Sequence, residues 1–268
     1  MRVIIKDNYD KCSKWVAEYI ADKINKSKNK QFVLGLPTGS TPLGVYKYLI
    51  SMYENKLVSF KNVITFNMDE YVGLDANNKQ SYNYFMWNNF FKFIDIKKEN
   101  VNILNGITNN IVLECEQYEE KIKACGGIDL FFGGVGSDGH IAFNEPYSSL
   151  SSKTRIKTLT STTIKDNSRF FDYDIGKTPK TALTVGVGTI MNSREVIIMA
   201  NGLSKADAIY SAIEGPITQL SPISMLQLHE KAIIVCDKEA TNELKVKTVN
   251  YFNDIENNIL KKVIQRMT

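Results

Sequence analysis

The sequence predicts an α/β protein in which helices cover both faces of a doubly wound, mostly parallel, Rossmann-like central sheet. Two observations lead to this fold class. Short apolar runs rich in Val, Ile and Phe alternate with segments whose apolar residues recur every three or four positions. The first pattern indicates strands buried on both faces, and the second indicates amphipathic helices. Strand and helix in regular alternation favour parallel pairing with crossover helices.

Six strands are expected, in chain order. Each run is four or five residues long and is dominated by β-branched, aromatic or other apolar residues, which suits a fully buried strand. The runs are Phe32–Leu36, Val63–Phe66, Ile128–Phe132, Ala182–Val185, Val196–Ala200 and Ala232–Cys236.

Helices are expected between and after these strands. Leu43, Tyr46, Leu49, Ile50 and Tyr53 recur at helical spacing, which places one apolar face on the segment after the first strand. One helix is also expected within residues 1–30, and a polar loop or mobile flap at Tyr147–Lys157. The remaining expected helices are Ser81–Phe93, Glu114–Lys123, Ser204–Ile213 and Glu239–Phe252.

Length and composition limit the classes of protein. A chain of 268 residues fits one large α/β domain or two small ones. Without a low-complexity linker or a repeat of 20–50 residues, a single domain over residues 1–268 is favoured. The net charge of +4 comes from interspersed signs and is too weak to indicate a nucleic acid partner.

The location predicted for the chain is the cytoplasm. No apolar run approaches the length of a membrane span, so no membrane partner is expected. The N-terminus turns polar at once, unlike a signal peptide. None of the four cysteines forms a CxxC pair, which is consistent with a reduced compartment.

Chemically versatile side chains follow the predicted strands at their carboxyl ends. Ligands of open α/β sheets bind outside this edge. We therefore expect one site built from residues that lie far apart in the sequence. The segments are Pro37–Pro42, Asn67–Glu70, Gly133–Pro146, Gly186–Gly188 and Asn201–Lys205.

The most informative segment places Asp138, His140 and Glu145 within eight residues, directly after a glycine-rich turn. A histidine between two acids can be fixed in one tautomer and can transfer protons near neutral pH. The same three side chains could instead hold a metal ion, but a second histidine is missing from the segment and no metal is predicted. The other histidine, His229, is expected to be structural.

Three features of the sequence are compatible with an anion-binding site. Thr38–Pro42 has the form of a helix entry, which is either a simple cap or an anion site. Lys205 is unfavourable beside a helix N-terminus unless an anion such as phosphate is bound there. Arg169 is either a second phosphate clamp or an ordinary surface residue. Gly134–Gly139 matches GxGxxG in letters, but Asp138 would repel a pyrophosphate, so no dinucleotide and no cofactor is predicted.

Several of these segments together resemble the glucosamine-6-phosphate deaminase family over essentially the whole chain. They are Leu36–Pro42, Phe66–Tyr71, Gly134–Pro146, Ser168–Phe171, Ala182–Gly188 and Glu243–Thr248. The resemblance implies conversion of glucosamine 6-phosphate and water into fructose 6-phosphate and ammonia, without a redox cofactor. It implies that Asp69 is the general base and that His140, oriented by Asp138 and Glu145, assists ring opening. It also implies phosphate binding by Gly39, Ser40, Thr41, Arg169 and Lys205.

Some members of that family are hexamers activated by N-acetylglucosamine 6-phosphate. The resemblance therefore implies a homo-oligomer, a lid from about Arg155 to Thr184, and an activator site. That site would contain Ser148, Arg155, Lys157, Thr158 and Tyr251.

Two other functions remain as alternatives to the deaminase. A 6-phosphogluconolactonase-like hydrolase has a related architecture but would not need the Asp69 proton shuttle. A sugar-phosphate-sensing domain of a transcription regulator would usually carry a helix-turn-helix segment. Residues 1–30 leave too little chain for that segment before the first predicted core strand.

Overall fold

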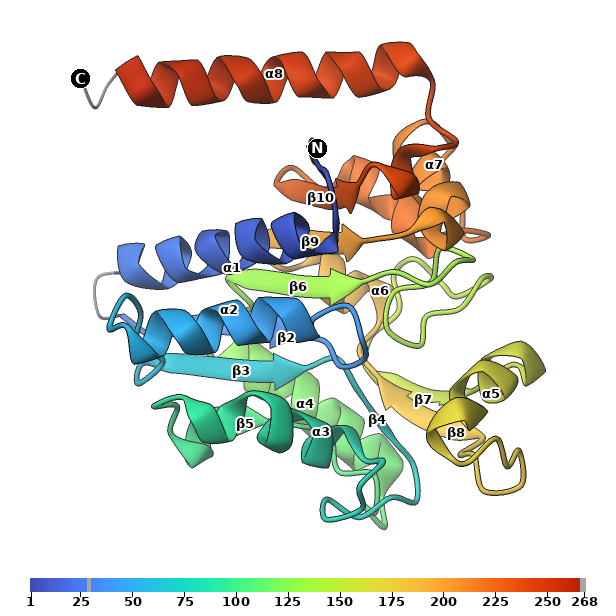
Figure 1. Ribbon diagram of the computed structural model, residues 1–268. Helices are drawn as coiled ribbons and strands as arrows, with labels where there is room; N and C mark the ends of the chain where they lie inside the picture. The colour runs from blue at the N-terminus through green and yellow to red at the C-terminus, as the bar shows by residue number, and fades with distance from the viewer. Residues whose placement is uncertain (28–29, 266–268) are drawn as a thin grey trace.

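The computed structural model describes residues 1–27 and 30–265. Its centre is a seven-stranded sheet with the order β1-β10-β9-β6-β2-β3-β5 (Figure 1). All neighbouring strands in it pair in parallel, so the predicted fold class is confirmed. The strands are β1 (Arg2–Lys6), β2 (Phe32–Leu36), β3 (Val63–Asn67), β5 (Val101–Asn102), β6 (Leu130–Gly134), β9 (Glu195–Ala200) and β10 (Ala232–Asp237).

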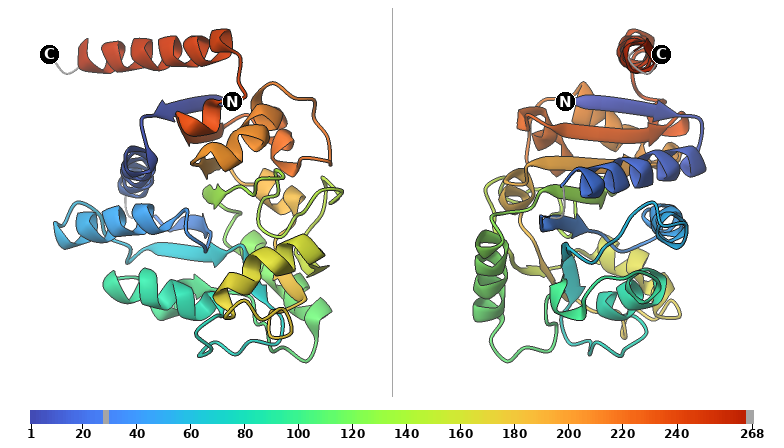
Figure 2. Two further views of the ribbon diagram at one scale, coloured as in Figure 1. Left: turned by 45° about the vertical axis from the view of Figure 1, so that its right-hand side comes forward. Right: turned by 90° about the vertical axis from the view of Figure 1, so that its left-hand side faces the viewer.

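Helices cover both faces of this sheet (Figure 2). Helices α1 (Tyr9–Lys26), α2 (Leu43–Glu54) and α3 (Tyr82–Asn89) share one core layer with the sheet, in which Leu34 and Leu49 are fully buried. Helices α4 (Ile111–Ala124), α6 (Val187–Met191) and α7 (Ala206–Ile213) share the other layer, which contains Val33 and Ile209. Val33 and Leu34 enter opposite layers because successive strand side chains point to opposite faces.

The C-terminal helix α8 (Val246–Gln265) lies beyond β1, at the edge of the molecule (Figure 1). The guanidinium of Arg2 donates two hydrogen bonds of 2.6 Å to the carboxylate of Glu256 and so ties α8 to the first strand. Tyr251, Ile255 and Ile259 on the same helix remain exposed.

A second, three-stranded antiparallel sheet extends from the carboxyl end of β3, with the order β4-β8-β7. It consists of β4 (Asp69–Tyr71), β7 (Arg155–Thr158) and β8 (Thr181–Thr184), and the short helix α5 (Ser161–Asn167) lies between β7 and β8 in the chain. Met68 joins the two sheets, because its amide donates to the Leu36 carbonyl at 3.1 Å and its carbonyl accepts from the Val185 amide at 2.8 Å.

The prediction for Ala182–Val185 is wrong about its sheet. The sequence pattern places this run among the parallel strands, but it forms β8 of the antiparallel sheet. Gly186, which follows it, packs against the backbone of Ser152, and a Cβ there would lie 2.0 Å from the Ser152 carbonyl oxygen. The Gly186–Gly188 segment is therefore not part of the ligand-binding edge, contrary to the prediction. The prediction failed because a four-residue apolar run does not reveal its pairing partner.

Other boundaries also differ from the prediction. Helix α3 ends at Asn89 and is followed by a separate 3-10 turn at Phe91–Phe93. The helix expected at Glu239–Phe252 is a 3-10 turn at Glu239–Thr241 followed by α8, which begins only at Val246. The short strands β1, β4, β5 and β7 are absent from the prediction, because each contains charged or polar residues and so lacks a continuous apolar run.

The prediction of one domain over residues 1–268 includes 28–29 and 266–268, which lie outside the described residues, and it stays a prediction. Among the helices in the described part of the chain, none is both long and apolar enough to cross a bilayer.

Candidate active site

A cavity of about 780 Å³ opens at the carboxyl ends of the central strands. Strands β2 and β6 are neighbours there, and the chain leaves them in opposite directions: β3 and β5 follow on one side, β9 and β10 on the other. Such a reversal of strand order is where open α/β sheets form ligand crevices. Most of the residues predicted for the site line this single cavity, namely Gly39, Ser40, Thr41, Asp69, His140, Arg169 and Lys205.

Asp69 is the first residue of β4 and is only 5% exposed. Burial, and then the neighbouring Glu70 carboxylate, raise the pKa of Asp69 well above its usual value. No described residue hydrogen-bonds its Oδ1 atom. A buried carboxylate with a raised pKa and an unpaired oxygen beside a cavity is suited to accept and return a proton.

Glu70 supports the same wall of the cavity from behind. Its carboxylate accepts hydrogen bonds of 2.8–2.9 Å from the backbone amides of Tyr71, Tyr82 and Asn83. The last two amides open α3, so the buried charge is placed where the helix dipole favours an anion. This arrangement fixes Tyr82, whose side chain lines the cavity.

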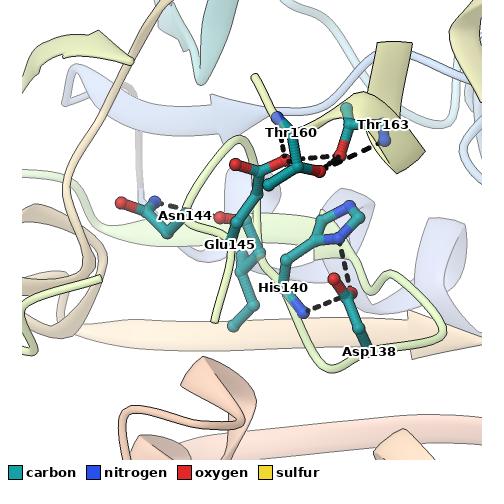
Figure 3. Close-up of polar contacts among 7 residues, drawn as sticks. Asp138, His140, Asn144, Glu145, Thr160 and Thr163 are labelled. Carbon is teal, nitrogen blue, oxygen red and sulfur yellow. Dashed lines mark hydrogen bonds and ion pairs between the residues drawn. The ribbon is translucent and has the colours of Figure 1, made fainter. Parts of the chain in front are cut away.

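Asp138 orients the imidazole of His140 (Figure 3). Their Oδ1 and Nδ1 atoms lie 2.6 Å apart, and the His140 amide donates to the same oxygen at 3.2 Å. Burial raises the pKa of Asp138, but the hydrogen bond and charge of His140 outweigh it and leave that pKa below its usual value. With Nδ1 donating to the carboxylate, the neutral ring keeps Nε2 as a proton acceptor.

Gly136 provides the room for this ring. A Cβ at Gly136 would lie 2.2 Å from the imidazole, so any larger residue would displace His140. The Gly136 amide also donates to the His140 carbonyl at 2.9 Å and closes the turn.

Glu145 has different partners from those expected. Its Oε1 accepts from the Thr160 amide at 3.1 Å, from the Thr160 hydroxyl at 2.9 Å and from the Thr163 hydroxyl (Figure 3). These groups lie at the N-terminus of α5. Between the described residues Glu145 and His140 there is no hydrogen bond or ion pair. A buried carboxylate needs hydrogen-bond donors, and a helix start offers several in one place. The spacing of the acid–histidine segment could not reveal partners that lie fifteen residues further on.

The two predicted cations reach the same cavity from different elements. Arg169 lies in the 3-10 turn Ser168–Phe170, with its guanidinium 4.7 Å from the Phe170 ring centroid. Burial lowers the pKa of Lys205; Asp138 opposes this change and the positive charge of Arg169 adds to it. A bound anion would relieve both the desolvation and the repulsion, so the charges favour an anionic ligand.

The loop that carries Lys205 is fixed from the neighbouring strand. Both carboxylate oxygens of Asp237 lie 3.0 Å from the Gly202 amide, and Oδ1 also accepts from the Ala240 amide at 3.0 Å. Gly202 has φ +85°, a conformation that favours glycine.

The turn after β2 completes the cavity wall. Gly39 has φ +93°, and α2 begins after Pro42 without a side-chain cap. The first two amides of α2 already have acceptors: that of Leu43 donates to the Ser40 carbonyl at 3.4 Å, and that of Gly44 donates to the Tyr9 hydroxyl at 2.8 Å. An anion at this helix entry would therefore bind to amides of the preceding turn.

Sequence reasoning missed several residues of the cavity, among them Tyr82 and Thr163. Tyr82 is one of 13 tyrosines, and its aromatic-rich surroundings gave no signal that it lines the cavity. Thr163 comes from α5, whose position over the site depends on the antiparallel sheet.

The five residues matched to an activator site do not meet within one chain. Arg155, Lys157 and Thr158 lie on β7, and Ser148 is buried in the preceding loop. Tyr251 is on α8, which lies at the other end of the molecule from β7 (Figures 1 and 2).

His229 is held by the backbone, as expected for a structural residue. Its Nε2 lies 2.8 Å from the Ser193 carbonyl oxygen, and its Nδ1 accepts from the Lys231 amide at 3.0 Å. Among residues 1–27 and 30–265, no three side chains of His, Cys, Asp or Glu gather closely enough to hold a metal ion.

A switch-point cavity that combines a buried carboxylate, an acid–imidazole pair and converging cations defines an α/β enzyme for a small anionic substrate. The family model described as "Glucosamine-6-phosphate isomerases/6-phosphogluconolactonase" matches residues 7–235. The chain belongs to this family.

Two curated relatives cover almost the whole chain. The glucosamine-6-phosphate deaminase of Borreliella burgdorferi is 61% identical over 268 residues, which are 97% of this chain and 100% of the relative. The glucosamine-6-phosphate deaminase of Bacteroides thetaiotaomicron is 62% identical over 259 residues, which are 96% of each chain.

Solved structures support the same placement. A monomeric glucosamine-6-phosphate deaminase superposes with a TM-score of 0.86 at 38% identity and covers 90% of this chain and 98% of its own. The 6-phosphogluconolactonase of Trypanosoma brucei has a TM-score of 0.74 at 20% identity over 91% of this chain and 98% of its own, which shows a shared fold.

Proposed function

We propose that this chain converts glucosamine 6-phosphate and water into fructose 6-phosphate and ammonia. The observation that carries the proposal is that Asp69, His140 and the cations Arg169 and Lys205 line one cavity, with Asp138 hydrogen-bonded to His140. The relatives at 61% and 62% identity, which are named glucosamine-6-phosphate deaminases, support the same substrate.

The phosphate anchors the substrate. In the proposal, Arg169 and Lys205 neutralise its charge, and the turn at Gly39, Ser40 and Thr41 donates hydrogen bonds to its oxygens. Binding energy from this remote group then holds carbons 1 and 2 of the sugar in a fixed position beside Asp69.

His140 opens the ring. Its Nε2 accepts the proton of the C1 hydroxyl and delivers a proton to the ring oxygen, while the bond from C1 to that oxygen breaks and C1 becomes a carbonyl. Asp138 keeps the imidazole in the required tautomer and stabilises its protonated form.

Asp69 then moves hydrogen between adjacent carbons. The carboxylate removes the proton from C2 while the C1 oxygen takes a proton from the substrate's own ammonium group, and the resulting enolamine accepts the C2 proton back at C1. The product is an imine at C2, to which water adds as ammonia leaves. Because the gain of hydrogen at C1 balances its loss at C2, the sequence of steps involves no net oxidation.

A direct test mixes the purified protein with glucosamine 6-phosphate and measures ammonia and fructose 6-phosphate in equal amounts. The lactonase alternative is tested in parallel with 6-phosphogluconolactone. Lactone hydrolysis without any ammonia from the amino sugar would reverse the assignment.

We also propose that the protein works in the cytoplasm as a homo-oligomer, a hexamer by resemblance, and that N-acetylglucosamine 6-phosphate activates it. The separation of Tyr251 from Ser148, Arg155, Lys157 and Thr158 supports an activator site shared between copies. One solved relative is described as monomeric, so the oligomeric state of this chain has to be measured. Light scattering gives that state, and assays with and without the activator test the regulation.

A further inference from the structure

The hydroxyl of Tyr9 holds three backbone groups of the turn between β2 and α2. Its oxygen lies 3.1 Å from the carbonyl oxygens of Ser40 and Thr41, between which it shares its one proton. The same oxygen accepts a hydrogen bond of 2.8 Å from the Gly44 amide. Tyr9 is the first residue of α1, so one side chain connects the start of that helix to the start of α2.

The helices approach closely enough for this contact because residue 44 is glycine. A Cβ at Gly44 would lie 3.0 Å from the Tyr9 ring and 2.4 Å from the Ser13 hydroxyl oxygen. The Tyr9 ring itself is half-buried and packs against the core layer that α1 and α2 share. The position of the hydroxyl is therefore fixed by packing on both sides.

The turn separates Tyr9 from the cavity. Thr41 lines the cavity, Tyr9 and Gly44 line a different hollow, and Ser40 lies between the two and lines both. The Ser40 carbonyl and the Thr41 amide belong to one planar trans peptide and point in opposite directions. With the carbonyl drawn to Tyr9, the Thr41 amide faces away from the tyrosine.

We propose that Tyr9 is a positioning residue for the substrate phosphate, acting through the Ser40–Thr41 turn without touching the substrate. This inference rests on the proposed function. An anion site made of backbone amides depends on their orientation, and the phenol sets the orientation of the Thr41 amide by holding the Ser40 carbonyl at the other end of the same peptide group.

The variant Tyr9→Phe keeps the ring and removes the hydroxyl. We expect KM for glucosamine 6-phosphate to rise about three- to tenfold, the effect of losing roughly one hydrogen bond's contribution to the site, with kcat changed by less than about twofold. The inhibition constant of inorganic phosphate should rise by the same factor. The matched control is Tyr48→Phe, whose hydroxyl donates to Asp10 beside the same outer hollow and should leave both constants unchanged.

A fall in kcat at constant KM would overturn the inference, as would a lower melting temperature with unchanged phosphate binding. If Tyr9→Phe does not fold, Gly44→Ala, which pushes the ring away, must give the same split between KM and kcat. The variant Lys205→Ala separates the role of Tyr9 from the phosphate site itself. If phosphate binding weakens in Lys205→Ala but not in Tyr9→Phe, the role of Tyr9 is refuted. If phosphate binding is unchanged in both Lys205→Ala and Tyr9→Phe, the phosphate site is refuted.

Discussion

Replacing Asp69 with asparagine removes the proposed base while keeping the shape of the side chain. A positioned general base contributes about 10²–10⁴-fold to a rate, so kcat should fall by that factor, which corresponds to roughly 2.7–5.5 kcal/mol in the barrier. Because Arg169, Lys205 and the Gly39–Thr41 turn are unaltered, KM should change by less than about threefold.

The thermal stability of Asp69→Asn, unlike its kcat, should stay the same or increase. The pKa of Asp69 is raised in the folded protein, so the folded state keeps a proton that the unfolded state releases. Stability therefore falls as the pH rises from the unfolded value of about 3.9 to the folded pKa, and stays reduced above it. The asparagine side chain is not ionisable, so the Asp69→Asn variant should melt at the same or a higher temperature at pH 7, and the difference should vanish near pH 3.

The assay combines ammonia release with thermal melting at both pH values. Near-normal turnover by Asp69→Asn would exclude this residue as the base. A lower melting temperature at pH 7, together with a loss of substrate binding, would show that the carboxylate supports the fold rather than the reaction.

The remaining predictions concern the imidazole and the anion site. His140→Gln should slow turnover of the cyclic sugar by about 10²-fold or more, and should slow an open-chain analogue much less; equal loss on both substrates would contradict a role in ring opening. Gly136→Ala should lower kcat by about tenfold or more because a Cβ would lie 2.2 Å from the ring, and a crystal structure with His140 in place would contradict this. Lys205→Ala should raise KM by about tenfold or more, and an effect confined to kcat would rule out a phosphate role.

The sequence was sufficient for five of the seven central strands, β2, β3, β6, β9 and β10, because these are almost entirely buried. Phe32–Leu36 and Ala232–Cys236 are continuous apolar runs with a turn signal after them, and both pair in parallel as expected. Ala182–Val185 has the same composition, yet it pairs antiparallel with β4 and β7. Apolar character reports burial, whereas the choice of partner depends on contacts between distant segments.

The same limit applies to the site. The rule that ligands bind at the carboxyl edge was enough to place Asp69 and His140 in one cavity, and their chemical types suggested their roles. It could not show that Glu145 is hydrogen-bonded to Thr160 and Thr163, nor that Tyr9 supports the turn at Ser40. Those contacts depend on how α5 and α1 dock, which no local spacing encodes.

The junction at Met68 has a mechanical consequence. Asp69 belongs to the three-stranded sheet, whereas His140 and the Ser40–Thr41 turn follow strands of the seven-stranded sheet. A small rotation between the two sheets would move the Asp69 carboxylate, together with Arg169 in the segment between β7 and β8, relative to Lys205 and the Ser40–Thr41 turn. The position of the proposed base relative to the bound sugar therefore depends on how the two sheets pack, and Met68 is one of the residues that joins them.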